Sequence, residues 1–419
     1  MKKTFVAVAV LGAFAGSAFA ADVTLYGVID QGLHYSHQRA TADVNVAGAS
    51  LSGSDSVNKF DMASGQNSGS RWGLKGTEDL GFAKVGFVLE NGFTSDDGKL
   101  GQGSRLFGRE AIAYLDGDFG TLAFGRTGAL AAGTGSYNLA KYTAFSTGWG
   151  SLTAQKANFW IGDRDRMDNT VTYRTPSFAG FQVTAQYSFN RDGQETEGNE
   201  RQNDRYAAIG ASYNNGPFSA ALVVDSVFYN YKGTSDKDSL GVTLGASYDF
   251  EVVKLFAQAQ YGQHEKRMGL ATADINDGTV TTVAGEKHYS DDYIAATSDK
   301  GWKGYGLSLG ATAPVLGGTA YAQVSYLDAK TNDGATAKFN GTGDVAEAAD
   351  LTAVEFEKAK AKNWGIALGY SYPFSKRTFA YTYASYNELK TTVDVKAVDA
   401  SATVKTKNTE FGLGLVHKF

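Results

Sequence analysis

Large apolar residues alternate with small or polar residues along most of this 419-residue chain. The alternation is clearest over residues 22–35, 181–189 and 240–250. A period of two is typical of a strand that turns one face to an apolar medium and the other to water. Beyond residue 20 no segment has a convincing amphipathic helical period, so we expect an all-β fold.

The chain ends in a strand of the same kind. Phe411, Leu413, Leu415 and the terminal Phe419 share one face of residues 410–419, and the other face is mostly small or polar. Such a strand can pair with the first strand of the chain and leave no open sheet edge. The pattern favours a closed, antiparallel transmembrane β-barrel with lipid outside and water inside.

The connections between the predicted strands come in two sizes. All four prolines fall in short turns, where a strand ends and no ladder donor is lost. Counting strands between the connections gives about 16, an even number as in single-chain bacterial barrels. The expected short turns are 116–120, 175–180, 214–217, 314–318 and 373–377, and the expected long loops are 36–68, 127–165, 265–301, 331–360 and 390–406.

The first 20 residues have the features of a secretory signal peptide. A Lys2-Lys3 pair precedes an apolar run over residues 5–14, and residues 18–20 form a small-x-small cleavage site. The apolar run is too short for a transmembrane helix. We therefore expect residues 1–20 to be removed and residues 21–419 to form one barrel domain.

Composition excludes several classes of function. The chain has no cysteine, which excludes disulfides, thiolate metal sites and cysteine nucleophiles. The formal charge is −5, and loss of Lys2 and Lys3 would make it −7. A mildly acidic net charge argues against nucleic-acid binding, because nucleic-acid-binding proteins present a basic surface.

Aromatic residues recur near the ends of the predicted strands. This placement predicts two aromatic girdles at the membrane interfaces, although Tyr and Phe also favour strands for other reasons. The residues concerned are Tyr26, Tyr35, Tyr187, Phe189, Tyr370, Tyr372, Tyr381 and Tyr383.

Four short motifs, in this order and with the signal peptide and terminal Phe419, resemble the general porins of Gram-negative bacteria, especially betaproteobacteria. The motifs are LYG at 25–27, SRWGLKG at 70–76, FGTLAFGR at 119–126 and TVTYR at 170–174. The resemblance covers essentially the whole mature chain. It implies an outer-membrane channel for small hydrophilic solutes and ions, surrounded by lipid, without a cofactor and assembled as a homotrimer. It also implies that the barrel-assembly machinery recognises Phe419.

In that family the third long loop folds into the pore and faces a basic cluster on the wall. Arg71, Arg126 and Arg166 stand where the family carries this cluster, and Arg109 is a plausible fourth member. An arginine stays charged under all conditions, and a cluster in a water-filled pore attracts anions. The alternative is that each arginine is solvated outside the barrel or paired with a carboxylate.

The third loop departs from the family pattern because residues 127–162 contain no Asp or Glu. Lys141 and Lys156 lie within it, and Asp163 and Asp165 follow. We expect a basic, partly aromatic and anion-selective constriction, which Glu90 on a neighbouring strand could weaken. The aromatic residues are Tyr137, Tyr142, Phe145, Trp149, Phe159 and Trp160.

Other functions receive less support from the sequence. His34 and His37 fall on opposite faces of a strand and form no obvious metal pair, and nothing resembles an activated-serine turn beside His264. Asp96-Asp97 and Asp291-Asp292 could bind Ca²⁺, but such pairs are usually solvated. A substrate-specific channel for a sugar or small organic acid, and an adhesive barrel acting through its long loops, remain open alternatives.

Overall fold

The computed structural model describes most of the chain, with gaps in the longer connections. No described helix is long and apolar enough to cross a bilayer. The described residues are 23–46, 48–146, 149, 159–160, 162, 164–193, 203–229, 237–265, 273–274, 281–282, 293–298, 301–332, 335–340, 354–356, 358–395 and 400–419. The expected signal peptide, residues 1–20, lies outside them.

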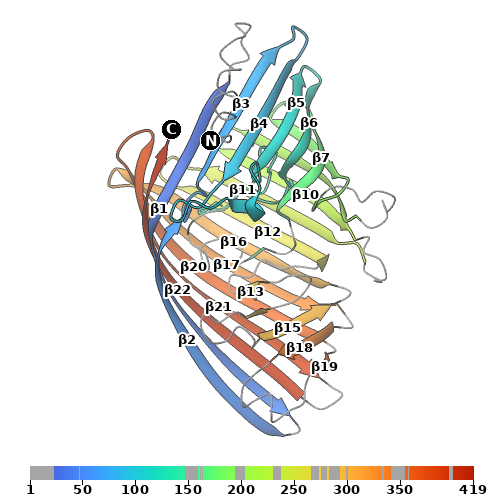
Figure 1. Ribbon diagram of the computed structural model, residues 1–419, viewed down its shortest axis with the longest axis vertical. Coiled ribbons are helices and arrows are strands. Elements are labelled where there is room, and N and C mark those ends of the chain that lie inside the picture. The colour runs from blue at the N-terminus through green and yellow to red at the C-terminus, as the bar shows by residue number, and fades with distance from the viewer. Residues whose placement is uncertain are drawn as a thin grey trace, which may run out of the picture.

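Seventeen strands form one antiparallel sheet that closes on itself (Figure 1). Consecutive strands pair around the ring, and β1 pairs with β22 to close it. The strands are β1 (Thr24–Val46), β2 (Ala49–Ser64), β3 (Arg71–Asp79), β4 (Lys84–Gly92), β5 (Glu110–Gly117), β6 (Gly120–Gly128), β7 (Arg166–Arg174), β8 (Phe181–Ser188), β9 (Arg205–Asn215), β10 (Phe218–Phe228), β11 (Leu240–Asp249), β12 (Lys254–Glu265), β16 (Trp302–Val315), β17 (Gly318–Thr331), β20 (Lys358–Pro373), β21 (Thr378–Val395) and β22 (Ala400–Lys418).

The 17 strands occupy 16 positions in the barrel, which confirms the predicted number. β2 and β3 both pair with β1, β2 over residues 31–46 of β1 and β3 over residues 24–28. They therefore share one position, interrupted at residues 65–70. Three further elements are not part of the barrel sheet. One is a four-residue helix, α2 (Gly101–Ser104). The others are a two-stranded sheet of β13 (Ala273–Asp274) and β14 (Thr281–Thr282) and a three-stranded sheet of β15 (Tyr293–Ser298), β18 (Ala335–Asn340) and β19 (Val354–Phe356).

Two of the expected long loops are largely strand instead. Residues 36–46 and 49–64 continue as a paired β1–β2 ribbon, and residues 390–395 and 400–406 continue β21 and β22. These residues include few large apolar side chains, and this composition predicted loops. A strand that rises beyond the membrane has water on both sides and needs no apolar face. The five expected short turns all separate consecutive strands as predicted.

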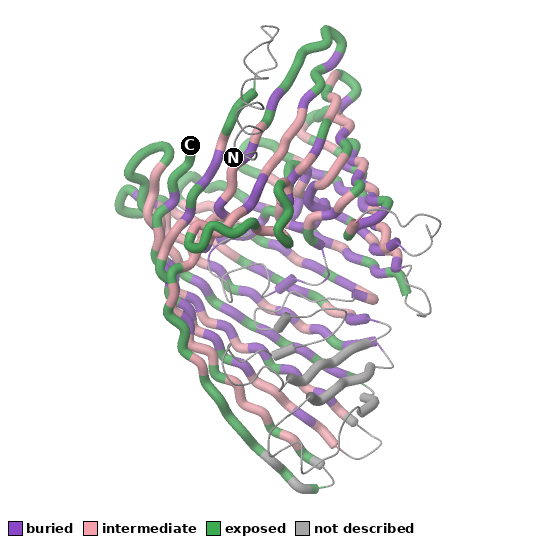
Figure 2. The backbone as a smooth tube through the Cα atoms, in the orientation of Figure 1, coloured by how far each residue is buried: buried purple, intermediate pink, exposed green. Residues whose placement is uncertain are grey.

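The alternation sorts side chains as expected (Figure 2). On β11, Leu240, Leu244 and Tyr248 are exposed while Thr243 and Ser247 are buried. On β22, Phe411, Leu413 and Leu415 are exposed on the outward face, as predicted for the terminal strand. The inside of the barrel is thus largely polar and its outside is apolar.

The girdle prediction holds for only part of its residues. Tyr187 contacts Phe189 and Tyr372 contacts Phe374, both near strand ends, whereas Tyr35 stacks on Phe411 midway along β1 and β22. Tyr381 and Tyr383 are instead almost fully buried on the inward face, and Tyr26 donates a hydrogen bond to Glu90. The prediction was wrong for these three because β1 and β21 carry aromatic residues on both faces, so proximity to a strand end does not identify the outward side.

The C-terminal residue is built into the seam between the first and last strands. The backbone N–H of Gly27 donates to the carbonyl oxygen of Phe419 at 3.0 Å, and the N–H of Phe419 donates to the carbonyl oxygen of Gly27 at 3.1 Å. The Phe419 ring covers Gly27 so closely that a Cβ there would lie 2.2 Å from the ring. Only glycine leaves room for the terminal ring at this position.

Candidate functional site

Two of the predicted arginines approach one carboxylate at the end of β3 and β4 that lies beside the long connections. The Nε of Arg109 donates to Glu90 at 2.6 Å, and the Nε of Arg71 lies 3.5 Å from the other oxygen of Glu90. Arg71 also donates to the carbonyl oxygen of Gly69 at 2.9 Å. Glu90 pairs in register with Gly73 and receives the hydroxyl of Tyr26, so this group lies on the inward face.

Arg126 belongs to a different group. It pairs in register with Ala111 of β5, and the pairing of β6 with β7 shifts register between Gly125 and Thr127. Its Nη1 donates to Asp168 at 2.6 Å, and Arg105 contacts both oxygens of the same carboxylate at 2.7 and 2.8 Å. Arg105, Arg126 and Asp168, called the rim group below, thus share a different carboxylate from the one that Arg71 and Arg109 share.

Arg166 lies between these two groups. The charges of both Arg109 and Arg126 act on its guanidinium, which is mostly buried. Asp165 approaches it at 3.5 Å, and its Nε has no hydrogen-bond partner among the described residues. Arg166 thus retains a donor that no described residue uses.

The remaining predicted residues are only partly within the described chain. Lys141 is exposed, and Asp165 is exposed beside Arg166. Lys156 and Asp163 lie outside the described residues. Arg105, which the sequence analysis did not select, contributes to the rim group. Arg105 stands in a long connection without periodicity, so no pattern in the sequence marked it.

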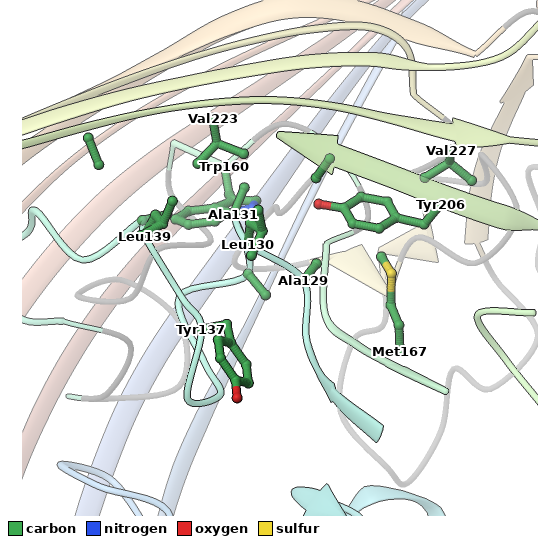
Figure 3. Packing of buried hydrophobic residues seen from close by; sticks show 14 of the residues in the cluster. Ala129, Leu130, Ala131, Tyr137, Leu139, Trp160, Met167, Tyr206, Val223 and Val227 are labelled. Carbon is green, nitrogen blue, oxygen red and sulfur yellow. The ribbon is translucent and has the colours of Figure 1, made fainter. Parts of the chain in front are cut away.

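The described part of residues 129–165 packs against the inward faces of β9 and β10. Figure 3 shows Leu130, Leu139 and Trp160 gathered beside Val223, with Tyr206 and Met167 near them. All six side chains are buried. Burial also raises the pKa of Tyr137, in the same segment, to about 12.

A second part of this segment packs against the opposite wall. Phe145 and Trp149 are buried, and the Trp149 ring lies 4.7 Å from that of Tyr321 and 5.4 Å from that of Tyr381. Tyr381 in turn donates a hydrogen bond to buried Asp30 at 2.6 Å. The aromatic side chains of the segment are therefore used in packing, and the expected aromatic lining of an opening is not what these residues form.

Buried charges fix both ends of the segment. Arg164 contacts Asp225 of β10 through two nitrogens, at 2.6 and 3.0 Å, and also contacts Glu265 of β12. Burial alone would lower the pKa of Arg164, but the attraction of Asp225 and Glu265 outweighs it and raises this pKa well above the usual value. At the other end, Ser136 donates to Glu110 of β5 through both its N–H and its hydroxyl, at 3.0 and 2.7 Å.

The other candidate sites gain no support from the geometry. Among the described residues, no group of three or more His, Asp or Glu side chains could hold a metal ion. Asp97 pairs with Lys99 at 2.8 Å in an exposed connection. His34 contacts Asp61 and Glu410, and Asp291-Asp292 lies outside the described residues.

The whole-chain comparison settles the family. The model of the Gram-negative porin family matches residues 7–419. The chain belongs to the Gram-negative porin family. This porin is 33% identical to an outer membrane porin protein of Bordetella pertussis, with all of both chains covered. It is 32% identical to outer membrane porin protein 32 of Delftia acidovorans, over 64% of this chain and 72% of that protein.

A solved structure agrees with the fold of this porin. The anion-selective porin from Comamonas acidovorans matches with a TM-score of 0.60 and 26% sequence identity, over 96% of this chain and all of that one. The chain is therefore an outer-membrane porin of a Gram-negative bacterium, and its relatives are porins rather than enzymes.

Proposed function

We propose that this porin lets small hydrophilic solutes and ions diffuse passively through a constriction that favours anions. The observation that carries the proposal is a local charge imbalance. Arg71 and Arg109 share the single carboxylate of Glu90, and residues 127–162 contain no Asp or Glu to oppose them. In a water-filled pore with a wall of low dielectric constant, uncompensated positive charge attracts anions and repels cations.

In this proposal residues 129–165 form the inward-folded third loop that narrows the pore. Its contacts with inward-facing residues of β9, β10 and β21 support that position. Arg71, Arg109 and Arg166 supply the positive field at the constriction, with Lys141 and Lys156 on the loop. Arg126 acts from the rim, while Glu90, Asp163 and Asp165 moderate the field. The anion selectivity of the Comamonas acidovorans porin is consistent with this assignment.

The burial of the loop aromatics favours a general channel over a substrate-specific one. A channel that guides a sugar or aromatic acid needs exposed ring faces on which the solute can stack. Phe145, Trp149, Phe159 and Trp160 are each at most 5% exposed.

Charge reversal tests the proposal in planar bilayers. The reversal potential across a KCl gradient would be compared for Arg109→Glu, Arg126→Glu and Lys237→Glu, since Lys237 is exposed in a connection far along the chain. We expect a severalfold loss of chloride preference for Arg109→Glu, a smaller loss for Arg126→Glu and almost none for Lys237→Glu. Cation preference in the unmodified porin, or equal effects of all three substitutions, would overturn the proposed constriction.

Assembly follows from the family resemblance and stays part of the proposal. The signal peptide 1–20 would be removed on export, the barrel-assembly machinery would recognise Phe419, and three copies would associate as a homotrimer. N-terminal sequencing and the mass of the purified assembly in detergent test the first and last of these points. A mature chain that retains residues 1–20, or a monomeric mass, would contradict them.

A further inference from the structure

The barrel position that β2 and β3 share is interrupted by a corner that turns into the barrel. Residues 65–70, called the inward corner below, connect the two strands. The hydroxyl of Tyr383, on the inward face of β21, donates to the side-chain oxygen of Gln66 at 2.9 Å. The backbone N–H of Trp149 also donates to the carbonyl oxygen of Gln66, which is buried. The inward corner therefore contacts both β21 and the segment 129–165.

A single buried carboxylate, that of Asp30 on β1, holds the inward corner. Its Oδ2 accepts the backbone N–H groups of Asn67 and Ser68, at 2.6 and 2.7 Å. Its Oδ1 accepts the hydroxyl of Tyr381 at 2.6 Å. The Asp30 side chain is fully buried, and a buried carboxylate needs hydrogen-bond donors to offset its lost hydration. The inward corner supplies two of the three donors, so its conformation and the burial of Asp30 depend on each other.

The backbone of Asp30 is fixed to both ends of the same corner. Its N–H donates to the hydroxyl of Ser70 at 3.1 Å, and the N–H of Gly65 donates to its carbonyl oxygen at 2.9 Å. Ser95 adds a bridge from the connection after β4. Its hydroxyl donates to the carbonyl oxygen of Asp30 at 3.1 Å, and its N–H donates to the hydroxyl of Ser64 at 2.8 Å. One residue of the first strand thus ties down the whole corner.

The inward corner in turn contacts both arginines that share Glu90. Arg71 donates from Nη1 to the hydroxyl of Ser68 at 3.0 Å and to the carbonyl oxygen of Gly69 at 2.9 Å. A Cβ on Gly69 would lie 2.9 Å from Nη1 of Arg109. The guanidinium of Arg71 therefore meets Glu90 on one side and the inward corner on the other. A chain of hydrogen bonds runs from the buried carboxylate of Asp30 through the corner to Arg71.

We propose that Asp30 is a positioning residue for ion selection, which fixes Arg71 through the inward corner. This inference rests on the proposed anion-favouring constriction. A charged side chain acts reproducibly on a passing ion only when the groups behind it hold it in one place. The carboxylate of Asp30 is fully buried, and its own negative charge opposes the passage of anions. Removing it should therefore lower the anion preference if Asp30 positions Arg71, and raise that preference if Asp30 acts by charge alone.

Reversal potentials of Asp30→Ala and Asp30→Asn across a KCl gradient separate these two roles. Asparagine keeps an oxygen for the N–H groups of Asn67 and Ser68 and an amide that can donate to Tyr381, whereas alanine keeps neither. We expect Asp30→Ala to lower the chloride-to-potassium permeability ratio by at least about twofold. Asp30→Asn should keep or slightly exceed the ratio of the unmodified porin. An equal rise of the ratio in both variants would overturn the proposal.

The Arg71→Gln background distinguishes this inference from the proposed function. An unchanged ratio for Arg71→Gln would overturn the proposed constriction, and this inference with it. If Arg71→Gln lowers the ratio, adding Asp30→Ala should cause almost no further loss, because the two residues then act as one unit. A full additional loss would overturn the inference alone, since Asp30 would then act without Arg71.

A thiol reporter tests the inward corner without reference to ion charge. Because the chain has no cysteine, Asn67→Cys places a single thiol on the corner. We expect Asp30→Ala to raise severalfold the rate at which a small neutral methanethiosulfonate modifies this thiol, because the corner opens more often. Asp30→Asn should leave the rate nearly unchanged. Equal rates with and without Asp30→Ala would show that Asp30 does not hold the corner.

A folding control completes the experiment. The heat-modifiable band on an electrophoresis gel verifies that each variant has formed the barrel. If Asp30→Ala does not fold, Tyr381→Phe takes its place, because it removes only one of the three donors to Asp30. The expected changes then have the same directions and a smaller size. An unchanged permeability ratio together with an unchanged rate of thiol modification in Tyr381→Phe would overturn the proposal.

Discussion

Glu90 is the residue that most limits positive charge at the inward wall. It accepts a hydrogen bond from Arg109, approaches Arg71 and also accepts the hydroxyl of Tyr26. Each arginine also feels the charge of the other, so Glu90 separates two like charges as well as neutralising one of them. Its position beside both arginines is the reason that we propose it moderates the anion preference of the constriction.

Replacing Glu90 by Gln should therefore increase the preference for anions. The substitution removes one negative charge and keeps a side chain of similar size, so Arg71 and Arg109 keep most of their surroundings. We expect a severalfold rise in the chloride-to-potassium permeability ratio, measured from the reversal potential. Glu78→Gln, at an exposed position near the short-turn end of β3, is the control. An unchanged ratio for Glu90→Gln would show that this group does not face the ion path.

The anchor of residues 129–165 is an element-scale feature that depends on buried charge. Arg164, Asp225 and Glu265 are at most 4% exposed and come from three separate parts of the chain. Removing Arg164 takes the shared cation from both carboxylates, and breaking a buried ion pair in this way costs about 3–5 kcal/mol. We therefore expect the cluster to hold this end of the segment against β10 and β12.

Arg164→Met should loosen that segment. We expect larger and noisier single-channel conductance and a lower urea midpoint of unfolding, because Asp225 and Glu265 lose their shared cation. Adding Asp225→Asn and Glu265→Gln to the same variant should recover much of the stability, since no unpaired charge then remains. If Arg164→Met conducts with the same amplitude and noise as the unmodified porin, the cluster does not hold the segment.

The β1–β22 seam is a second element whose stability rests on one small residue. Gly27→Val would drive a branched side chain into the Phe419 ring, and overpacking of this kind costs about 1–3 kcal/mol. We expect a lower yield of folded barrel, read from the heat-modifiable band on an electrophoresis gel, and a lower urea midpoint. Gly53→Val on β2 is the matched control because its Cβ would have no neighbour within 4 Å. Equal behaviour of the two variants would show that the terminal ring does not need Gly27.

The sequence predicted the strands better than it predicted the contacts inside the barrel. Alternation alone located the outward faces of β8, β11 and β22, because lipid accepts only apolar side chains there. The segment packed against β10 could also have been predicted, since Ala221, Val223 and Val227 make its inward face mostly apolar, with Asp225 as the exception. A barrel strand that is apolar on both faces needs a partner inside, and here residues of the segment 129–165 supply it.

Charged residues were harder to place because position along the chain does not fix which carboxylate a side chain meets. Arg71 and Arg126 both stand at strand ends beside long connections, yet Arg71 approaches Glu90 and Arg126 contacts Asp168. The pairing of Arg164 with Asp225 and Glu265 joins residues 61 and 101 positions apart, which no local pattern encodes. The closed topology of the whole barrel, rather than any motif, determines these contacts.

At the scale of the whole molecule, the proposed selectivity is electrostatic and must depend on salt. The Debye length falls from about 10 Å at 0.1 M to about 3 Å at 1 M, so a field that acts across a water-filled constriction weakens strongly over this range. We expect the chloride-to-potassium permeability ratio to approach one as the KCl concentration rises at a fixed gradient. The flux of a neutral sugar into loaded liposomes should stay constant over the same range, because the width of the opening does not change. A permeability ratio that is independent of salt would mean that anions are selected by direct dehydration at a tight binding site, and the wall arginines would then have to contact the ion itself.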